Sequence, residues 1–295
     1  MRAFDLVTAT DSRHAVALLA EHGANAKILA GGTDLLVELK SASHTPQVVI
    51  DISRAEDLKI IALTDAGLSI GALVTHTEIM RSPLICGLFP ALVDAAHTIG
   101  AVQTRNLGTL GGNLVTGVPS MDSGPTLIAL DARVTVAGSD GRRQMPLAEF
   151  FVGPRRTILK PDELLVEIVI PKQNLGKPAH FLKSGLRKGQ ALALVNACAS
   201  LWVDWDKHVF VAPRIALGAV APIVIRTPRA EAYLEGRAIT PDAMAEAGCI
   251  AVSEAKPISD FRASAEYRRD LIAVLTKRAL ENAYAQALAK HKQET

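Results

Sequence analysis

The run TIGAVQTRNLGTLGGNLV occupies residues 98–115, and PSMDSGP follows it at residues 119–125. Within Gly108–Asn113, three glycines alternate with threonine, leucine and asparagine. Glycine permits positive φ and lets another molecule approach the backbone, and consecutive amides in such conformations form nests that attract anions. We therefore interpret this stretch as a loop that binds a diphosphate. A pair of ordinary tight turns without a ligand is the alternative.

A second glycine segment, AGGTDL at residues 30–35, lies where a predicted strand, Lys27–Ala30, passes into a predicted short helix, Leu35–Lys40. Free amides at the start of a helix favour an anion. Neither segment is the Gly-x-Gly-x-x-Gly fingerprint of Rossmann domains or a Walker phosphate loop, and neither pattern occurs elsewhere in the chain. Two such segments together predict a dinucleotide that is held from two sides.

Length and composition describe an ordinary globular protein. The chain has 295 residues, 49% hydrophobic and 21% charged, which is enough for two domains with a substantial core. The net charge of +2 and the scattered basic pairs argue against a nucleic-acid partner. No signal peptide is visible, and the longest apolar run, Ala191–Val203, is interrupted and too short to span a bilayer. We expect a cytoplasmic protein with no membrane span.

The cysteines and histidines indicate no metal site within this chain. Cys86, Cys198 and Cys249 are far apart and lack Cys-x-x-Cys spacing, so we expect reduced thiols and no zinc or iron–sulfur centre. The eight histidines include no pair at metal-ligand spacing. His76 is a candidate neighbour of the glycine segments, although a structural role is favoured.

No acid–base or nucleophilic set accompanies the glycine segments. Asp122 allows two interpretations: it caps a helix predicted at Pro125–Leu130, or it accepts hydrogen bonds from the ribose or diphosphate of a nucleotide. Polar groups without an acid–base partner, arranged around two glycine segments, indicate a bound cofactor that brings its own reactivity.

Hydrophobic periodicity and turn residues divide the chain. In the first half, the expected elements are a helix from Asp11–Ser12 to Gly23, strands at Gln47–Ile52, Leu68–Ala72, Arg133–Ala137 and Leu164–Ile170, and a helix at Pro90–Thr98. The polar stretch Lys172–Pro178 marks a domain boundary. Beyond it we expect an antiparallel sheet of three strands at Ala191–Trp205, Val209–Val220 and Ile223–Arg226, then helices at Pro241–Glu254 and Ser264–Lys290.

A set of motifs, taken together, resembles one known family. The motifs are Ile28–Leu35, QxRNxGTxGGN at residues 103–113, PxxD at 119–122, FFxG at 150–153, DELL at 162–165, IxIP at 168–171, Lys183 with Arg187-Lys188, and DxRxSxxYR at 260–268. This combination, which covers nearly the whole chain, resembles the FAD-binding medium subunit of the molybdenum hydroxylases. Xanthine dehydrogenase, aerobic carbon monoxide dehydrogenase, 4-hydroxybenzoyl-CoA reductase and nicotinate dehydrogenase belong to that family.

The resemblance implies an α+β protein. Residues 1–174 would form a PCMH-type (vanillyl-alcohol-oxidase-like) FAD-binding domain of two α/β subdomains, at about 1–54 and 55–174. Residues 175–295 would form a C-terminal domain with a three-stranded antiparallel sheet and helices. Carried over by position, the residues implied to contact FAD are Ile28, Leu29, Ala30, Gly31, Gly32, Thr33, Asp34, Leu35, Ile99, Thr109, Leu110, Gly111, Gly112, Asn113, Asp122, Val166 and Lys183.

The resemblance also implies a role in electron transfer. A large subunit would carry molybdopterin, a small subunit would carry two [2Fe–2S] clusters, and FAD in this chain would pass electrons to an external acceptor. The assembly would be a heterotrimer or a dimer of heterotrimers. A stand-alone FAD oxidase or reductase of the PCMH superfamily is the alternative, and a nucleotide-binding regulator without redox function is a third reading.

Two departures from the family pattern stand out. Many relatives carry an acidic residue where this chain has Ala191, which changes the electrostatics expected near the isoalloxazine ring. The chain also lacks the cysteine-bearing insertion that binds a [4Fe–4S] cluster in some relatives, in agreement with its three dispersed cysteines.

Overall fold

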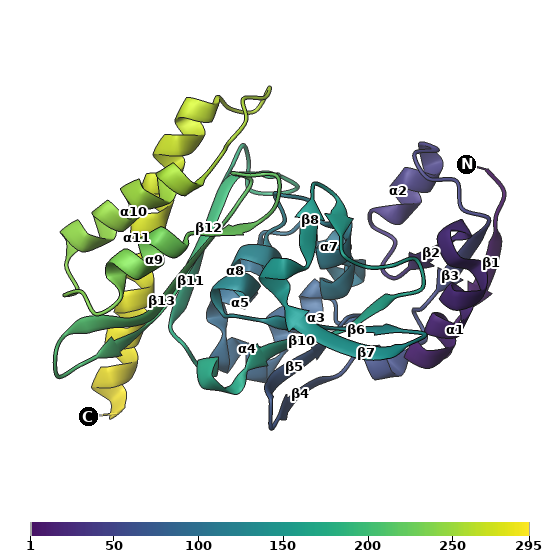
Figure 1. Cartoon of the computed structure of the whole chain (residues 1–295), viewed down its shortest axis with the longest axis horizontal. Helices are drawn as coiled ribbons and strands as arrows, with labels where there is room; N and C mark the ends of the chain where they lie inside the picture. The colour runs from purple at the N-terminus through teal and green to yellow at the C-terminus, as the bar shows by residue number, and fades with distance from the viewer. Residues whose placement is uncertain (1, 295) are drawn as a thin grey trace.

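A computed structural model describes residues 2–294 and places three parts in succession along the long axis of the molecule (Figure 1). The N-terminal lobe is a three-stranded parallel sheet in the order β1-β3-β2. Its elements are β1 (Asp5–Thr8), α1 (Ser12–His22), β2 (Ala26–Leu29), α2 (Leu35–Lys40) and β3 (Val48–Asp51).

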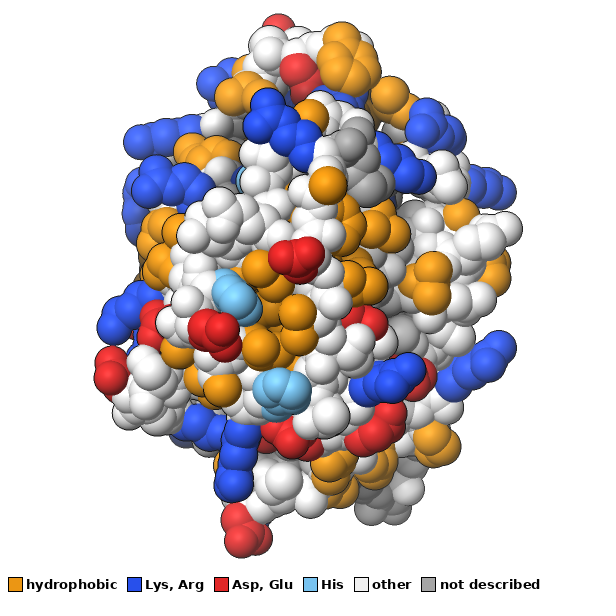
Figure 2. All heavy atoms as spheres, turned by 90° about the vertical axis from the view of Figure 1, so that its right-hand side faces the viewer, with side chains coloured by type: hydrophobic (Ala, Val, Ile, Leu, Met, Phe, Trp, Pro, Cys, Tyr) orange, Lys and Arg blue, Asp and Glu red, His pale blue; other side chains and the backbone are white. Residues whose placement is uncertain are grey.

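Helix α1 begins and ends where the sequence predicts. The Asp11 side chain accepts a hydrogen bond from the backbone N of His14 at 2.8 Å, and Gly23 follows the last turn with a φ of 51°. Figure 2 shows this end of the molecule, where hydrophobic side chains lie among charged ones. The large hydrophobic side chains that this lobe exposes are Leu6, Leu36 and Val37.

The middle lobe is a five-stranded antiparallel sheet in the order β4-β5-β10-β6-β7, packed against a group of short helices (Figure 1). The strands are β4 (Ile61–Thr64), β5 (Gly67–Gly71), β6 (Arg133–Gly138), β7 (Gly141–Pro146) and β10 (Leu164–Pro171). The helices are α3 (His76–Arg81), α4 (Pro83–Leu88), α5 (Pro90–His97), α6 (Val102–Leu107), α7 (Leu110–Thr116) and α8 (Ser123–Ala129). A small hairpin, β8 (Phe151–Gly153) with β9 (Arg156–Thr157), lies beside α7.

The C-terminal part is an antiparallel sheet in the order β11-β12-β13-β14, covered by helices. Its elements are β11 (Ala179–Gly185), β12 (Ala193–Asp204), β13 (Val209–Gly218), β14 (Ile225–Arg226), α9 (Pro228–Leu234), α10 (Pro241–Glu254) and α11 (Ala265–Glu294). The antiparallel arrangement is confirmed, but the expected number of strands is wrong, because β11 adds a fourth. Its seven residues directly follow Pro178 and offer only a short apolar alternation.

Three hydrophobic clusters hold these parts together. One fills the helical side of the middle sheet, and another lies between the C-terminal sheet and its helices. The third joins the N-terminal lobe to strand β10 through Leu164 and Val166. Burial of apolar surface therefore fixes the N-terminal lobe against the middle lobe. Among residues 2–294, no helix combines the length and apolar character that a membrane crossing requires.

Candidate cofactor-binding cleft

A cleft with an empty volume of about 980 Å³ is lined by residues of both the N-terminal and the middle lobe. Twelve of the residues implied to contact FAD line it: Ile28, Ala30, Gly31, Gly32, Thr33, Asp34, Leu35, Ile99, Thr109, Gly111, Gly112 and Asn113. A neighbouring cavity of about 710 Å³ shares Asp34, Ile99, Asn113 and Thr116 with it, and Asp122 lines that second cavity. The two cavities are therefore adjacent, and most of the implied residues line one or both of them.

The two glycine segments meet at the cleft. A Cβ atom placed on Gly31 would lie 1.8 Å from the carbonyl oxygen of Leu107 and 3.1 Å from Cα of Gly108. No side chain fits there, so the glycine at position 31 is required by direct backbone contact between the lobes. The predicted closeness of the two segments is present in the structure.

The first glycine segment presents free amide groups. Within residues 2–294, no hydrogen bond engages the backbone N–H of Gly31, Gly32, Thr33 or Asp34. Gly32 has a φ of 71°, which bends this run before helix α2, and Asp34 precedes that helix without a capping bond from its side chain. Consecutive unpaired amides of this kind attract an anion.

The second segment differs from its sequence interpretation. It is not a loop of bare amides but the first turn of helix α7, and most of its amides bind acceptors of the protein itself. Gly111 N donates to the carbonyl oxygen of Ala72 at 2.9 Å, and Gly112 N donates to Oγ1 of Thr109 at 3.0 Å. A Cβ on Gly111 would lie 2.7 Å from Cβ and from the carbonyl oxygen of Ala72. This glycine therefore allows α7 to pack closely against the end of β5.

Asp122 occupies the N-cap position of helix α8, but its side chain makes no capping hydrogen bond, so the interpretation as a side-chain cap is wrong. Its carboxylate is almost buried and accepts hydrogen bonds from Lys183 Nζ at 2.5 Å and Asn196 Nδ2 at 2.8 Å. Burial raises the pKa of the Asp122 carboxyl, while the Lys183 ammonium and its hydrogen bond act in the opposite direction. Both partners of Asp122 come from the C-terminal sheet, and residues 190–192, between β11 and β12, line the second cavity.

Four of the implied residues lie behind the cavity walls. Leu110 and Val166 are buried in the hydrophobic clusters, and Lys183 is held by Asp122. Leu29 ends strand β2, next to the lining residue Ala30. None of these four is among the residues that line the two cavities. The contacts implied for them with FAD stay predictions.

The structure adds lining residues that sequence reasoning missed. They are mainly apolar side chains: Ile52, Leu73, Leu159, Leu164 and Leu165. Glu163 also lines the cleft, and the hydrogen bonds from Arg143 lower the pKa of its carboxyl. The DELL motif at residues 162–165 was a signal for this wall, but the sequence does not show which way its side chains point.

The charged side chains that line the cleft are acidic. The lining residues of the larger cavity include His76, Asp34 and Glu163 but neither a lysine nor an arginine. Among the described residues, no group of three or more His, Cys, Asp or Glu side chains could hold a metal ion. The free amides of Gly31–Asp34 suit an anionic group, and the apolar side chains in the same lining suit an aromatic ring. The fold and the cleft thus define a protein of the dinucleotide-binding class.

Comparison with known proteins identifies the family. A family model described as the FAD binding domain in molybdopterin dehydrogenase matches residues 2–173, and one described as the CO dehydrogenase flavoprotein C-terminal domain matches residues 180–283. The chain is 33% identical to the carbon monoxide dehydrogenase medium chain of Hydrogenophaga pseudoflava, over 92% of this chain and 93% of that one. It is 32% identical to the xanthine dehydrogenase FAD-binding subunit of Escherichia coli O157:H7, over 94% of each.

Solved structures agree. Carbon monoxide dehydrogenase from Hydrogenophaga pseudoflava, in a form lacking the Mo-pyranopterin moiety of the molybdenum cofactor, matches with a TM-score of 0.92 at 33% identity over 97% of this chain and 98% of that one. Quinoline 2-oxidoreductase from Pseudomonas putida 86 matches with a TM-score of 0.89 at 30% identity, over 97% and 99%. The chain belongs to the family of FAD-binding medium chains of molybdopterin dehydrogenases, which confirms the expected family, fold and oxidoreductase class.

Proposed function

We propose that this chain is the electron-transferring flavoprotein subunit of a molybdenum hydroxylase complex. The observation that carries the proposal is the cleft between the lobes, whose lining combines four free amides at Gly31–Asp34 with apolar side chains. It occurs in a chain that matches medium chains of such dehydrogenases over nearly its full length. The cleft provides binding and orientation, and FAD supplies the redox chemistry when it is bound.

The residues present fit FAD. The unpaired amides of Gly31–Asp34 would bind the diphosphate, and Asn113, which lines both cavities, offers its amide group nearby. Ile28, Leu164 and Leu165 provide an apolar wall for an aromatic ring system. At the far end, Lys183 and Asn196 hold the Asp122 carboxylate in the second cavity, where it can accept hydrogen bonds from the ligand.

The partners follow from the proposed role. A large subunit would carry molybdopterin and the hydroxylated substrate, and a small subunit with two [2Fe–2S] clusters would deliver electrons to this chain. An external acceptor would then receive them. We propose a heterotrimer or a dimer of heterotrimers, which accords with a relative named as a medium chain.

Purification of the complex from its native host tests the proposal. We expect a yellow chain with a flavin absorption band, bound FAD, and copurification with a larger and a smaller subunit that contain molybdenum and iron. A colourless chain after gentle purification contradicts the proposal. Turnover of a small substrate by the isolated chain would indicate a stand-alone oxidase or reductase. Flavin that is reduced by dithionite and then reoxidised by no physiological acceptor would indicate a regulator.

A further inference from the structure

His76 lies in the wall of the cleft with a polar atom unsatisfied. Its side chain is 2% exposed, and within residues 2–294 the buried Nδ1 has no hydrogen-bond partner. A proton on Nδ1 would leave a buried N–H donor without an acceptor, which is costly. The neutral ring therefore carries its proton on Nε2. Burial, and to a lesser extent the charge of Arg105, lower the pKa of His76 to about 4, so the ring is neutral near pH 7.

The backbone holds this ring firmly in place. His76 is the first residue of helix α3, and a capping box between Thr75 and Glu78 fixes that turn. Its own backbone N donates to the carbonyl oxygen of Gly108 at 3.1 Å. Preorganisation of this kind reduces the entropy lost when a side chain binds a ligand.

The ring and Thr33 of the first glycine segment both lie next to Gly108. A Cβ on Gly108 would lie 3.5 Å from Cδ2 of His76 and 3.6 Å from Oγ1 of Thr33. Cδ2 is bonded to Nε2, so this edge of the ring faces the glycine segment, whereas Nδ1 lies on the opposite side. Thr33 belongs to the run of unpaired amides, and its hydroxyl and the imidazole are both neighbours of Gly108.

We propose that His76 donates a hydrogen bond from Nε2 to the diphosphate of the bound dinucleotide, as a neutral side-chain donor beside the amides of Gly31–Asp34. This inference rests on the proposed function. The residues lining this cavity include no lysine or arginine, so the direct contacts that they offer an anion come from neutral donors. A neutral imidazole adds a donor without adding a charge.

The test is a titration of FAD into the flavin-depleted full-length chain, followed by flavin fluorescence. We expect His76→Met, which has no donor, to lower the affinity roughly tenfold to a hundredfold, as for a lost hydrogen bond to a charged group. His76→Gln keeps a neutral N–H donor and should lose much less. His97→Gln, at an exposed histidine of helix α5, is the matched control and should bind FAD as the wild type does.

Competition with ADP identifies the part of FAD that is contacted. If His76 contacts the diphosphate, His76→Met should weaken the binding of ADP as much as it weakens the binding of FAD. The inference is overturned if His76→Met weakens FAD binding but not ADP binding, or if the variant binds FAD with the affinity of the wild type. Either result leaves the proposed function intact. Absence of FAD binding by the wild-type chain overturns both.

A measurement on the wild type covers the case in which His76→Met does not fold. In the FAD-bound chain labelled with ¹⁵N-histidine, we expect His76 to be the neutral tautomer with its proton on Nε2. We also expect the Nε2 resonance to shift when FAD is added. A proton on Nδ1 in the FAD-bound state, or no change at Nε2, overturns the inference.

Discussion

Asp122 and Lys183 form a buried ion pair of 2.5 Å between the middle lobe and the C-terminal sheet. Their side chains are 7% and 9% exposed. Lys183 also donates to the carbonyl oxygen of Thr98 at 3.2 Å, and its register partner on strand β12, Asn196, binds the other carboxylate oxygen of Asp122. The C-terminal sheet is therefore fixed to the floor of the second cavity by polar contacts that span both parts of the molecule.

Replacement of Lys183 by methionine should strongly destabilise the protein. The Asp122 carboxylate would remain buried without its cationic partner, and breaking such a pair costs about 3–5 kcal/mol of unfolding free energy. Urea unfolding followed by circular dichroism measures the loss. The double variant Asp122→Asn with Lys183→Met removes both charges and should recover a large part of it. Equal stability of the single and double variants would show that the charge on Asp122 is not responsible.

Replacement of Gly31 by alanine should prevent the two glycine segments from meeting. The new methyl group would lie 1.8 Å from the carbonyl oxygen of Leu107, so the N-terminal lobe must move away from the middle lobe. We expect the flavin content of the purified chain to fall at least tenfold. Gly87→Ala, in helix α4, is the control, because a Cβ there meets nothing within 4 Å. Full flavin occupancy in Gly31→Ala would show that the contact between the segments does not shape the site.

Much of the fold was predictable because its elements follow local rules. Helix α10 spans Pro241–Glu254 as expected, since proline opens it and Thr240 caps it through the backbone N of Ala243. Strand β11 was missed, because its seven residues depend on long-range pairing with β12. Short strands of this kind are stabilised by neighbours that local patterns do not reveal.

The site was predictable in outline only. The glycine pair at 31–32 was interpreted correctly as a source of free amides, whereas the amides of Gly111 and Gly112 proved to be occupied. The Gly112 amide binds the hydroxyl of Thr109, which caps α7, and the Gly111 amide reaches Ala72 because residues 74–76 pair with residues 108–110 through an isolated β-bridge at Thr75 and Thr109. That pairing joins distant segments and leaves no local signal in the sequence.

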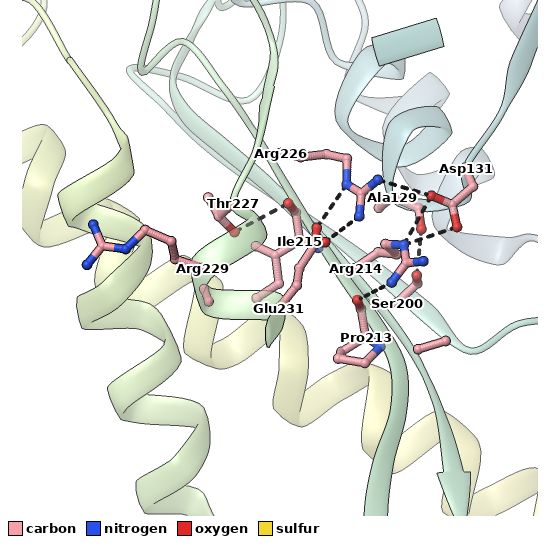
Figure 3. A network of polar contacts seen from close by, with 12 residues as sticks. Ala129, Asp131, Ser200, Pro213, Arg214, Ile215, Arg226, Thr227, Arg229 and Glu231 are labelled. Atoms are coloured by element: carbon pink, nitrogen blue, oxygen red, sulfur yellow. Dashed lines mark hydrogen bonds and ion pairs between the residues drawn. The ribbon is translucent and has the colours of Figure 1, made fainter. Parts of the chain in front are cut away.

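The stability of the protein should rise with pH in an alkaline window because of Lys177. Its ammonium group is buried and donates to the carbonyl oxygen of Ala212 at 2.7 Å, near the ion-pair network of Asp131, Arg214, Arg226 and Glu231 (Figure 3). Burial lowers the pKa of Lys177 from 10.5 to about 8, and the nearby carboxylates only partly offset this effect.

Between pH 8 and 10.5 the unfolded chain therefore binds a proton at Lys177 that the folded chain does not. Unfolding takes up this proton, so the free energy of unfolding increases with pH, by at most roughly 3 kcal/mol over the window. Urea unfolding at several pH values, for the wild type and Lys177→Met, isolates the contribution. We expect a smaller slope in the variant, and an identical slope would assign the effect to other groups.

The ion pair between Glu163 and Arg143 in the wall of the cleft leads to a prediction about the affinity for FAD. Glu163 lines the larger cavity and is 7% exposed, and Arg143 binds it through Nε at 3.0 Å and Nη2 at 2.7 Å. Arg143→Gln would remove the cationic partner of a carboxylate in the wall of the space proposed for an anionic cofactor. At low ionic strength we expect the variant to bind FAD roughly three- to tenfold more weakly than the wild type does. This difference should become smaller as added salt screens the repulsion. The double variant with Glu163→Gln should restore the affinity, so a loss that persists in it would point to a structural role for Arg143.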